Sequence, residues 1–512
     1  MASYKSNNYK KLAKNTKLNT ISGLVVFAIR IIIVLIMNPI FIQYLGSTSF
    51  GIWKSIERLL GFASIADGKA TQALKWTIAN QEASDDFDRK QRAIGSAIII
   101  WFLFLPILIT IISILIFFSS ELIKGVVESD YIIVKSIILI LGINLIITPL
   151  MSIPDSVLGG TNNGYISNSN RIIWMILGAI ITYVVLVFGY GLKEMAYTLL
   201  VITIFSGINA LYLAKKKIKW LNIKKTTKKE IHSFFKFSAW VLAWSLIAKF
   251  LLGSEVVLLS SLIGAQTVSQ FIFTSYLAFT TITLSAIVVS STTPGLGMLI
   301  GNKDFIKSQA IINKIRNFSF SFSIFSAASI LLLNKSFVYL WGGEELYLGW
   351  ENNFLIVLIM IQLIAIRNEG FLIDLSLDLK NKVLLGALSV LISVILSIVL
   401  YNLYSSVFSV LVGIFLGRFI LLFTFPIITN RVIQYKASTL SLTKNFFYTL
   451  VILFLSLYIG TNQTFSSWSE LFIFAIIEIV VCAIYVYLFL LSSDNRDKVK
   501  QIILKYRRKE NA

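Results

Sequence analysis

The chain has almost none of the residues that build a disulfide framework or a Cys/His metal site. Among its 512 residues there is one cysteine, Cys482, and one histidine, His232. Both kinds of site need several such residues, so both are excluded. Charge is also scarce, because 14% of the residues are charged, 56% are hydrophobic, and the mean hydropathy is +0.81. A soluble protein of this length needs more polar surface, which excludes a large soluble domain.

A phosphate-cradling glycine loop is lacking as well. Gly159-Gly160 is the nearest match, but the Gly-Lys-Ser/Thr that such a loop needs does not follow it. The sequence therefore does not indicate an ATP-driven pump, and we predict no cofactor and no metal.

Long hydrophobic stretches occupy most of the chain. A membrane-spanning helix needs about 20 apolar residues to cross about 30 Å of hydrocarbon. We therefore predict an all-α integral membrane protein with about 14 transmembrane helices, which we place at 19–45, 50–80, 93–118, 131–153, 171–189, 195–214, 237–262, 268–297, 317–334, 352–378, 383–400, 406–429, 445–460 and 471–492.

The net charge of +21 is distributed unevenly between the predicted loops. Lys and Arg gather in the two tails and the even-numbered loops, whereas the odd-numbered loops carry only Lys124, Lys193 and Lys335. Positive residues stay on the cytoplasmic side, so both termini are expected there. The densest lysine cluster, at 215–229, either orients the chain toward anionic headgroups or docks a partner. The basicity therefore indicates membrane topology rather than nucleic-acid binding.

The lysine-rich segment also divides the chain. We predict an N-terminal six-helix lobe at 1–214, a basic cytoplasmic linker at 215–236, a C-terminal six-helix lobe at 237–429, and a terminal helix pair with a basic tail at 430–512. Aligning Gly46 with Gly264 brings Asp86 onto Asp304. Both lobes begin in the cytoplasm, which predicts parallel repeats with a central cavity between them.

The second predicted span contains residues that interrupt a helix. It holds Gly61, Gly68 and a polar stretch from Ser64 to Thr71. Non-helical backbone at membrane depth survives only when it is buried in protein or lines water. Spans of this kind are expected to form cavity walls.

Several charged residues fall inside predicted spans, where each costs at least about 2.5–3.5 kcal/mol. Arg30 lies about eleven residues into the first span, roughly 16 Å deep at 1.5 Å per residue. Lys54, Glu57 and Arg58 share one helical face in the second span, with Trp53 beside them. Glu57 can pair with either neighbour, which leaves one positive charge uncompensated. These charges either favour a wet, net-positive cavity for an anion or form ion pairs that fix helix register.

The stretch from Tyr44 to Asp86 carries a family resemblance. It reads YLGSTSFGIWKSIERLLGFASIADGKATQALKWTIANQEASDD and resembles the start of polysaccharide flippases of the multidrug/oligosaccharidyl-lipid/polysaccharide exporter superfamily. The matching features are a Leu-Gly, Phe-Gly-Ile-Trp, Asp67-Gly68 and Ala73-Leu74. Two departures are Lys69, where an apolar residue is frequent, and Glu255, where aspartate is frequent.

The resemblance implies a flippase for undecaprenyl-diphosphate-linked oligosaccharides, such as O-antigen, lipopolysaccharide or capsule repeat units, in the bacterial plasma membrane. It implies transport without enzymatic chemistry. A polysaccharide polymerase and a chain-length regulator would be its protein partners. A lipid II flippase, a cation-coupled multidrug antiporter and a membrane polysaccharide polymerase remain alternatives.

The candidate site residues follow from their charge and depth. Candidates for substrate binding are Arg30, Trp53, Lys54, Arg58, Lys249, Arg367 and Arg418. Candidates for ion coupling or gating are Glu57, Asp67, Glu255, Glu369 and Glu478.

Overall fold

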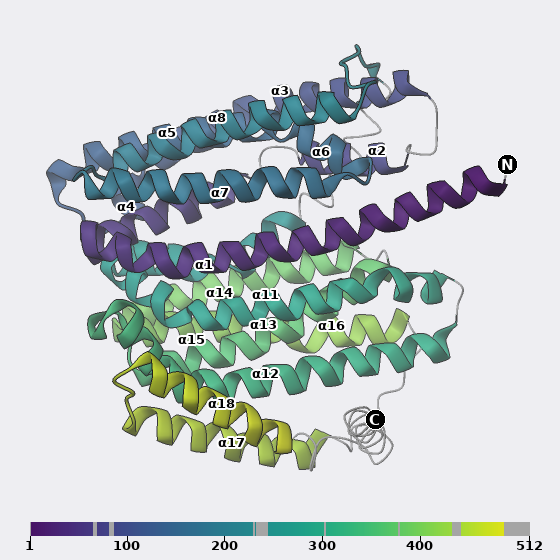
Figure 1. The fold of residues 1–512 in the computed structure, drawn as a ribbon. Helices are drawn as coiled ribbons and strands as arrows, with labels where there is room; N and C mark the ends of the chain where they lie inside the picture. Colours follow the sequence, from purple (N-terminus) through teal and green to yellow (C-terminus); the bar gives the residue numbers. More distant parts are fainter. Residues whose placement is uncertain are drawn as a thin grey trace. The chain divides into compact units, whose positions relative to one another are not determined.

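The computed structural model of the chain is built from helices (Figure 1). It describes residues 2–64, 69–80, 86–228, 231, 244–301, 304–376, 379–432 and 442–485. In these residues, ten helices are long and apolar enough to cross a membrane, or eleven if a pair bent by 58° counts as one span. In its described residues, each predicted span overlaps a helical segment. The chain is therefore an all-α, multi-pass membrane protein.

The first compact unit comprises Met1–Ser269. Its helices are α1 (Ala2–Ala63), α2 (Ala70–Asn80), α3 (Phe87–Phe117), α4 (Ser119–Leu122), η2 (Glu128–Asp130), α5 (Tyr131–Met151), α6 (Ile153–Gly160), α7 (Gly164–Val187), α8 (Leu192–Lys217), a helix at Trp244–Leu251, α10 (Ser254–Leu262) and the start of α11 (Ala265–Gly301).

The second compact unit comprises Gln270–Ala512. Besides the rest of α11, its helices are α12 (Phe305–Gly342), η3 (Glu344–Leu346), α13 (Trp350–Ser376), α14 (Leu379–Tyr404), α15 (Val407–Gly417), α16 (Phe419–Val432), α17 (Leu442–Asn462) and α18 (Trp468–Tyr485). The seventh predicted span groups with the first unit, because α10 packs against α1. The lobe boundaries expected at 214 and 237 stay a prediction.

Matching features at equivalent positions support the predicted repeat. Gly46, with φ of 80°, separates the first two spans of α1, and Gly264, with φ of 147°, precedes α11. Positive φ is strained for residues with a side chain, which explains glycine at both turns. Asp86 then caps α3 by accepting from the Arg89 amide, and Asp304 caps α12 by accepting from the Lys307 amide.

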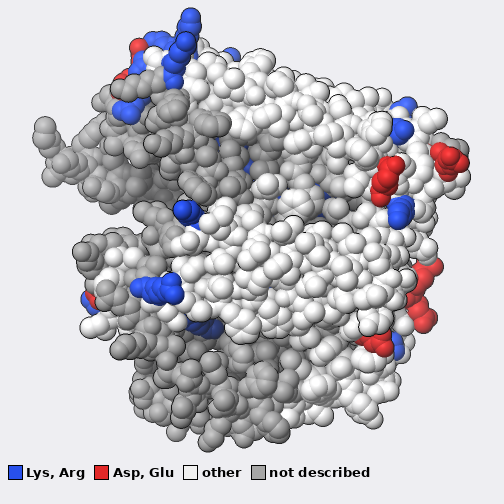
Figure 2. Space-filling view, turned by 180° about the vertical axis from the view of Figure 1, so that it is seen from behind, with Lys and Arg blue, Asp and Glu red and all other residues white. Residues whose placement is uncertain are grey.

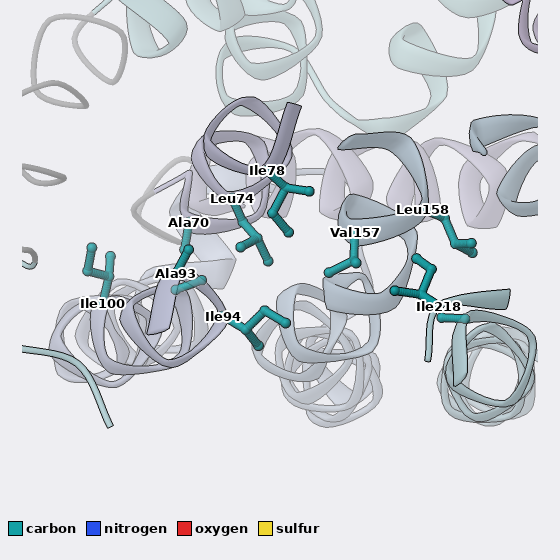
Figure 3. Packing of buried hydrophobic residues seen from close by; sticks show 11 residues of the cluster. Ala70, Leu74, Ile78, Ala93, Ile94, Ile100, Val157, Leu158 and Ile218 are labelled. Atoms are coloured by element: carbon teal, nitrogen blue, oxygen red, sulfur yellow. The ribbon is translucent and has the colours of Figure 1, made fainter. Parts of the chain in front are cut away.

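The second span is interrupted as its composition predicts. The helix that starts after Gly46 ends at Ala63, and α2 begins at Ala70. Asp67 lies among residues 65–68, outside the described part of the chain. The shorter α2 packs against α3 and α6 through small and branched apolar side chains (Figure 3), namely Ala70, Leu74, Ile78, Ala93, Ile94, Ala97, Ile100, Val157 and Leu158.

The two ends of the first unit differ in charge. Exposed acids, Glu121, Glu128 and Asp130, lie around α4 and η2. Exposed lysines lie at the end of α8 and in the residues that follow it. Figure 2 shows blue side chains gathered at the upper left, whereas red and blue side chains are mixed at the opposite end. We call the lysine-rich end of this unit its basic end.

Candidate functional site

A cavity of about 530 Å³ lies within the first unit. Helices α1, α5, α6, α7 and α8 form its wall. Most of the wall is apolar, and Gly178, Ala179 and Gly207 leave it room by having small side chains or none. The polar or charged lining residues are Arg30, Asn38, Lys54, Glu57, Thr148, Ser152, Asp155, Arg171, Thr182, Thr203 and Ser206.

Arg30 lines the cavity from the middle of the first span of α1. Among the residues that the structure describes, no hydrogen bond or ion pair reaches its guanidinium. Arginine remains protonated at any physiological pH. The cavity therefore presents a full positive charge whose five N–H donors are available to a ligand.

Trp53, Lys54 and Glu57 line the same cavity from the second span of α1. The Lys54 ammonium forms an ion pair of 2.9 Å with Glu57 and lies 5.4 Å from the centre of the Phe50 ring. The prediction that Glu57 pairs with one of its two basic neighbours is confirmed. Trp53 is buried, with 3% of its surface exposed, so its ring serves as part of the wall.

Asp155, Arg171 and Trp174 are cavity residues that the sequence analysis missed. Asp155 follows the predicted end of the fourth span, and Arg171 is the first residue of the predicted fifth span. In the structure α6 continues to Gly160, and α7 begins at Gly164, two turns before Arg171. Both charges therefore lie within helical segments. The helix-compatible sequence between Gly164 and Arg171 is the signal that could have revealed this.

Two polar atoms in this part of the wall lack a hydrogen-bond partner among the residues that the structure describes. These are Asp155 Oδ1 and the indole Nε1 of Trp174, both buried from solvent. A buried polar atom without a partner is costly, so such atoms mark places where a ligand or water binds. Counting all charged lining residues, three cations face two carboxylates, and the charge of the wall is net positive.

Arg58 and Lys249 take part in a different arrangement, at two helix breaks. Arg58 Nη1 donates to the carbonyl of Leu252, 3.4 Å away, where the helices Trp244–Leu251 and α10 meet at 58°. Lys249 Nζ donates to the carbonyl of Gly61 at 2.8 Å and to Ser64 Oγ at 3.0 Å, where the second span is interrupted. Each broken helix thus supplies the cation that satisfies the freed carbonyl of the other, which is the favourable placement of a cation at a helix C-terminus.

Phe62 and Phe250 stack beside these hydrogen bonds, with ring centres 4.4 Å apart. A Cβ on Gly253 would lie 2.7 Å from Arg58 Cδ, so a larger residue there would have to displace the Arg58 side chain. Glu255 follows in the first turn of α10 and is 1% exposed. Arg58 and Lys249 are therefore committed to backbone carbonyls, and their predicted substrate contact would require these bonds to break.

In the second unit, Glu369 forms a bidentate ion pair with Arg316. Arg316 Nε and Nη2 lie 2.5 and 2.9 Å from the two carboxylate oxygens, and Nη1 donates to Asn430 Oδ1 at 2.8 Å. This network ties α12, α13 and α16 together. Glu369 is thus part of a structural ion pair, and a coupling role for it remains a prediction that requires the pair to separate.

The other three candidates of the second unit are buried or half-buried. Arg367 is half-buried on α13. Arg418 is 1% exposed at the junction of α15 and α16. Glu478 is 9% exposed on α18, facing Ser329 of α12. None of the three is among the lining residues of the cavity described above.

The fold has known counterparts, although neither a protein-family model nor a curated protein sequence matches the chain. The inward closed conformation of the lipid II flippase MurJ matches with a TM-score of 0.66, 16% identity, and coverage of 92% of this chain and 98% of that one. An inward-facing multidrug resistance MATE family transporter of the MOP superfamily matches with a TM-score of 0.59 and 15% identity. The match covers 78% of this chain and 94% of that one. A mutant of the Vibrio cholerae MATE transporter VcmN matches with a TM-score of 0.58 and 14% identity, and the match covers 83% of this chain and 98% of that one.

These similarities establish the fold. At 14–16% identity they show that the chain shares the helical membrane-transporter fold of these structures. The predicted fold class is therefore confirmed.

Proposed function

We propose that the chain is a flippase that moves undecaprenyl-diphosphate-linked oligosaccharide repeat units, of the O-antigen or capsule kind, across the bacterial plasma membrane. The lipid tail stays in the bilayer, and the anionic head group passes through a cationic cavity by alternating access. The two tails and the even-numbered loops, which are rich in Lys and Arg, lie on the cytoplasmic side. No covalent chemistry takes place on the cargo.

Arg30 is the observation that carries this proposal. It lies within a membrane-spanning helix and lines the cavity, and it has no carboxylate partner among the described residues. An unpaired charge at this depth is costly and marks a functional position. A guanidinium binds two oxygens of a phosphate at once, which makes a diphosphate a well-matched guest.

The rest of the wall suits a sugar next to that diphosphate. Trp53 and Trp174 provide flat apolar surface, and Thr148, Ser152 and Thr182 provide hydroxyl oxygens. At about 530 Å³ the cavity has the usual size of a small-molecule site. It accommodates the diphosphate with the first sugar, while the remaining sugars and the lipid lie outside it.

Glu57 is the coupling candidate that shares this cavity. Its carboxylate is 41% exposed and pairs with Lys54, so arrival of a diphosphate at Lys54 would release it. Competition between cargo and carboxylate for one ammonium gives a simple means of linking cargo binding to a local conformational change. Asp67, Glu255, Glu369 and Glu478 remain proposals for coupling without a described place in this cavity.

Lipid II is the second candidate cargo. The match to MurJ, with a TM-score of 0.66 over 92% of the chain, favours it, and lipid II also carries a diphosphate. A cationic drug is a poorer fit, because three cations line the cavity against two carboxylates. A drug antiporter would need a net-negative cavity, in which acids such as Glu57 and Asp155 outnumber the cations.

The proposal is tested by replacing Arg30 in the source bacterium after deletion of the chromosomal copy. Arg30→Ala should abolish surface glycan and cause undecaprenyl-diphosphate-linked repeat units to accumulate in membrane extracts, as measured by mass spectrometry. Arg30→Lys should restore part of the delivery, because charge is kept and the bidentate geometry is lost.

Arg431→Ala serves as the matched control, since Arg431 is exposed in the last turn of α16. Immunoblots of membranes establish that each variant inserts. Accumulation of lipid II in place of repeat units would assign the second cargo. Normal glycan delivery by Arg30→Ala would refute the role of the cavity.

A further inference from the structure

The lysine-rich segment after α8 is bound to the start of α3. The Gln91 side-chain amide donates to the carbonyl of Trp220 at 2.7 Å, and the Lys224 amide donates to the carbonyl of Gln91 at 3.3 Å. Ile218 is 5% exposed and packs in the same apolar cluster as Ile94 (Figure 3). Residues 218–226 therefore have a defined path along α3.

Gly95 and Ser96 explain how the segment approaches so closely. A Cβ on Gly95 would lie 2.2 Å from the carbonyl oxygen of Lys224, so only glycine permits this contact. Ser96 Oγ and Thr226 Oγ1 are 2.6 Å apart, within hydrogen-bonding distance. The sequence of α3 is thus specifically fitted to the segment.

Lys90 of α3 is a buried lysine that contacts the segment through Trp220. Its side chain is 3% exposed, and its ammonium lies 5.5 Å from the centres of both the Phe87 and the Trp220 rings. The two rings are themselves stacked, with centres 6.2 Å apart. A cation this close to two aromatic rings is attracted electrostatically to both. Lys90 therefore contributes to holding the segment rather than to its exposed charge.

The remaining lysines of the segment point outward. We call them the basic platform: Lys215, Lys216, Lys217, Lys219, Lys224, Lys225 and Lys228, all of which are exposed. Asp88 pairs with Lys224 at 2.6 Å and compensates one of these charges. The other lysines keep the platform strongly positive at the basic end of the unit (Figure 2).

We propose that the basic platform is a preformed docking surface for anionic phospholipid head groups. The platform begins at the last turn of α8, a helix long and apolar enough to span the membrane, so its lysines emerge at the membrane surface. It lies outside the cavity lining, so it does not compete for the cargo.

Lipid phosphate is the chemistry that this surface fits. Lysine ammonium groups on flexible stems bind as point charges and adapt to head groups at varied positions. Each lysine near an anionic surface strengthens binding by roughly fivefold. The backbone beneath them is already ordered on α3, so less conformational freedom is lost on binding than for a disordered basic tail.

The test is native mass spectrometry of the full chain in detergent, titrated with phosphatidylglycerol or phosphatidylcholine. The variant Lys216→Gln/Lys219→Gln/Lys225→Gln should lower phosphatidylglycerol affinity at least tenfold and leave phosphatidylcholine binding unchanged. Raising the salt should weaken phosphatidylglycerol binding to the native chain, because screening acts within about 10 Å at 0.1 M.

The control variant makes the same change in charge at the other end of the unit. Lys124, Lys135 and Lys193 are exposed there, and their triple replacement by Gln should leave phosphatidylglycerol affinity within twofold of the native chain. Gly95→Ala keeps every lysine but displaces the Lys224 peptide, and it should reduce the affinity several-fold. Thermal unfolding confirms that each variant is folded.

Three outcomes would overturn the proposal. Equal losses in the two triple variants would show that only net charge matters. An unchanged affinity in folded Gly95→Ala would show that the lysines act as a flexible tail rather than a preformed surface. Unchanged lipid binding in the platform variant, together with loss of a co-purifying acidic protein, would assign the platform to a protein partner.

Discussion

At the scale of single residues, the membrane charges divide into those with a partner and those without one. Arg58, Lys249 and Glu369 are held by carbonyls or by Arg316, whereas Arg30 has no partner among the described residues. In the sequence, all of these residues are charged side chains within predicted spans, and nothing there separates them. Their partners distinguish a structural charge from one that is available to a ligand.

The Arg316–Glu369 pair supports a stability prediction. Glu369→Gln leaves Arg316 without its anion next to the α13 interface, and loss of one partner of a buried pair costs about 3 kcal/mol. We expect a clear decrease in the unfolding temperature in detergent. Arg316→Met combined with Glu369→Leu should recover most of it, because the uncompensated charge is gone. A double variant no more stable than Glu369→Gln would contradict this explanation.

At the scale of helices, close contacts depend on glycine. On α15, Gly413 and Gly417 face Ser397 and Ser393 of α14, whose hydroxyls donate to carbonyls of α15. A Cβ on Gly413 would lie 2.3 Å from the Ser397 backbone nitrogen. Small residues permit this approach between membrane helices.

Gly413→Ala should therefore destabilise the protein by about 1–3 kcal/mol through overpacking. Gly61→Ala is the matched change, since Gly61 is helical and no atom lies within 4 Å of the position of its Cβ. It should be neutral or stabilise the helix slightly. Thermal unfolding of the two variants in the same detergent compares them, and equal shifts would argue against the packing account.

The two helix breaks are linked by Arg58 and Lys249, which gives a second prediction at this scale. Lys249→Met removes the hydrogen bonds to Gly61 and Ser64, each worth about 1.5–3 kcal/mol for a charged donor. Hydrogen exchange should accelerate near residue 64 and also near residue 252, because the breaks support each other. Adding Arg58→Gln should then have less effect than in the native chain. Strictly additive effects of the two changes would show that the breaks are independent.

At the scale of the whole chain, the sequence predicts helices, interruptions and repeat anchors well. Hydrophobic length locates the spans, Gly46 and Gly264 locate turns through their conformational freedom, and Asp86 and Asp304 locate helix starts through capping. All of these are local effects. The pairing of Arg316 with Glu369 and the arrival of Asp155 and Arg171 in one cavity depend on tertiary contacts, which local patterns do not encode.

Charge distribution predicts orientation at this scale. Both termini should be cytoplasmic, because Lys and Arg concentrate in the tails and in the loops on the same side. Green fluorescent protein fused to either end should fluoresce, whereas alkaline phosphatase fused to either end should be inactive. Active phosphatase at one terminus would reverse the assignment of that end.

The central claim is that Arg30 binds the diphosphate of a lipid-linked saccharide during its translocation. The most direct measurement is flipping of a fluorescent undecaprenyl-diphosphate oligosaccharide in proteoliposomes, followed by quenching of the outer-leaflet label. The native chain should flip the lipid, Arg30→Ala should slow the initial rate at least tenfold, and Arg30→Lys should lie between them. An Arg30→Ala rate equal to that of the native chain would contradict the account.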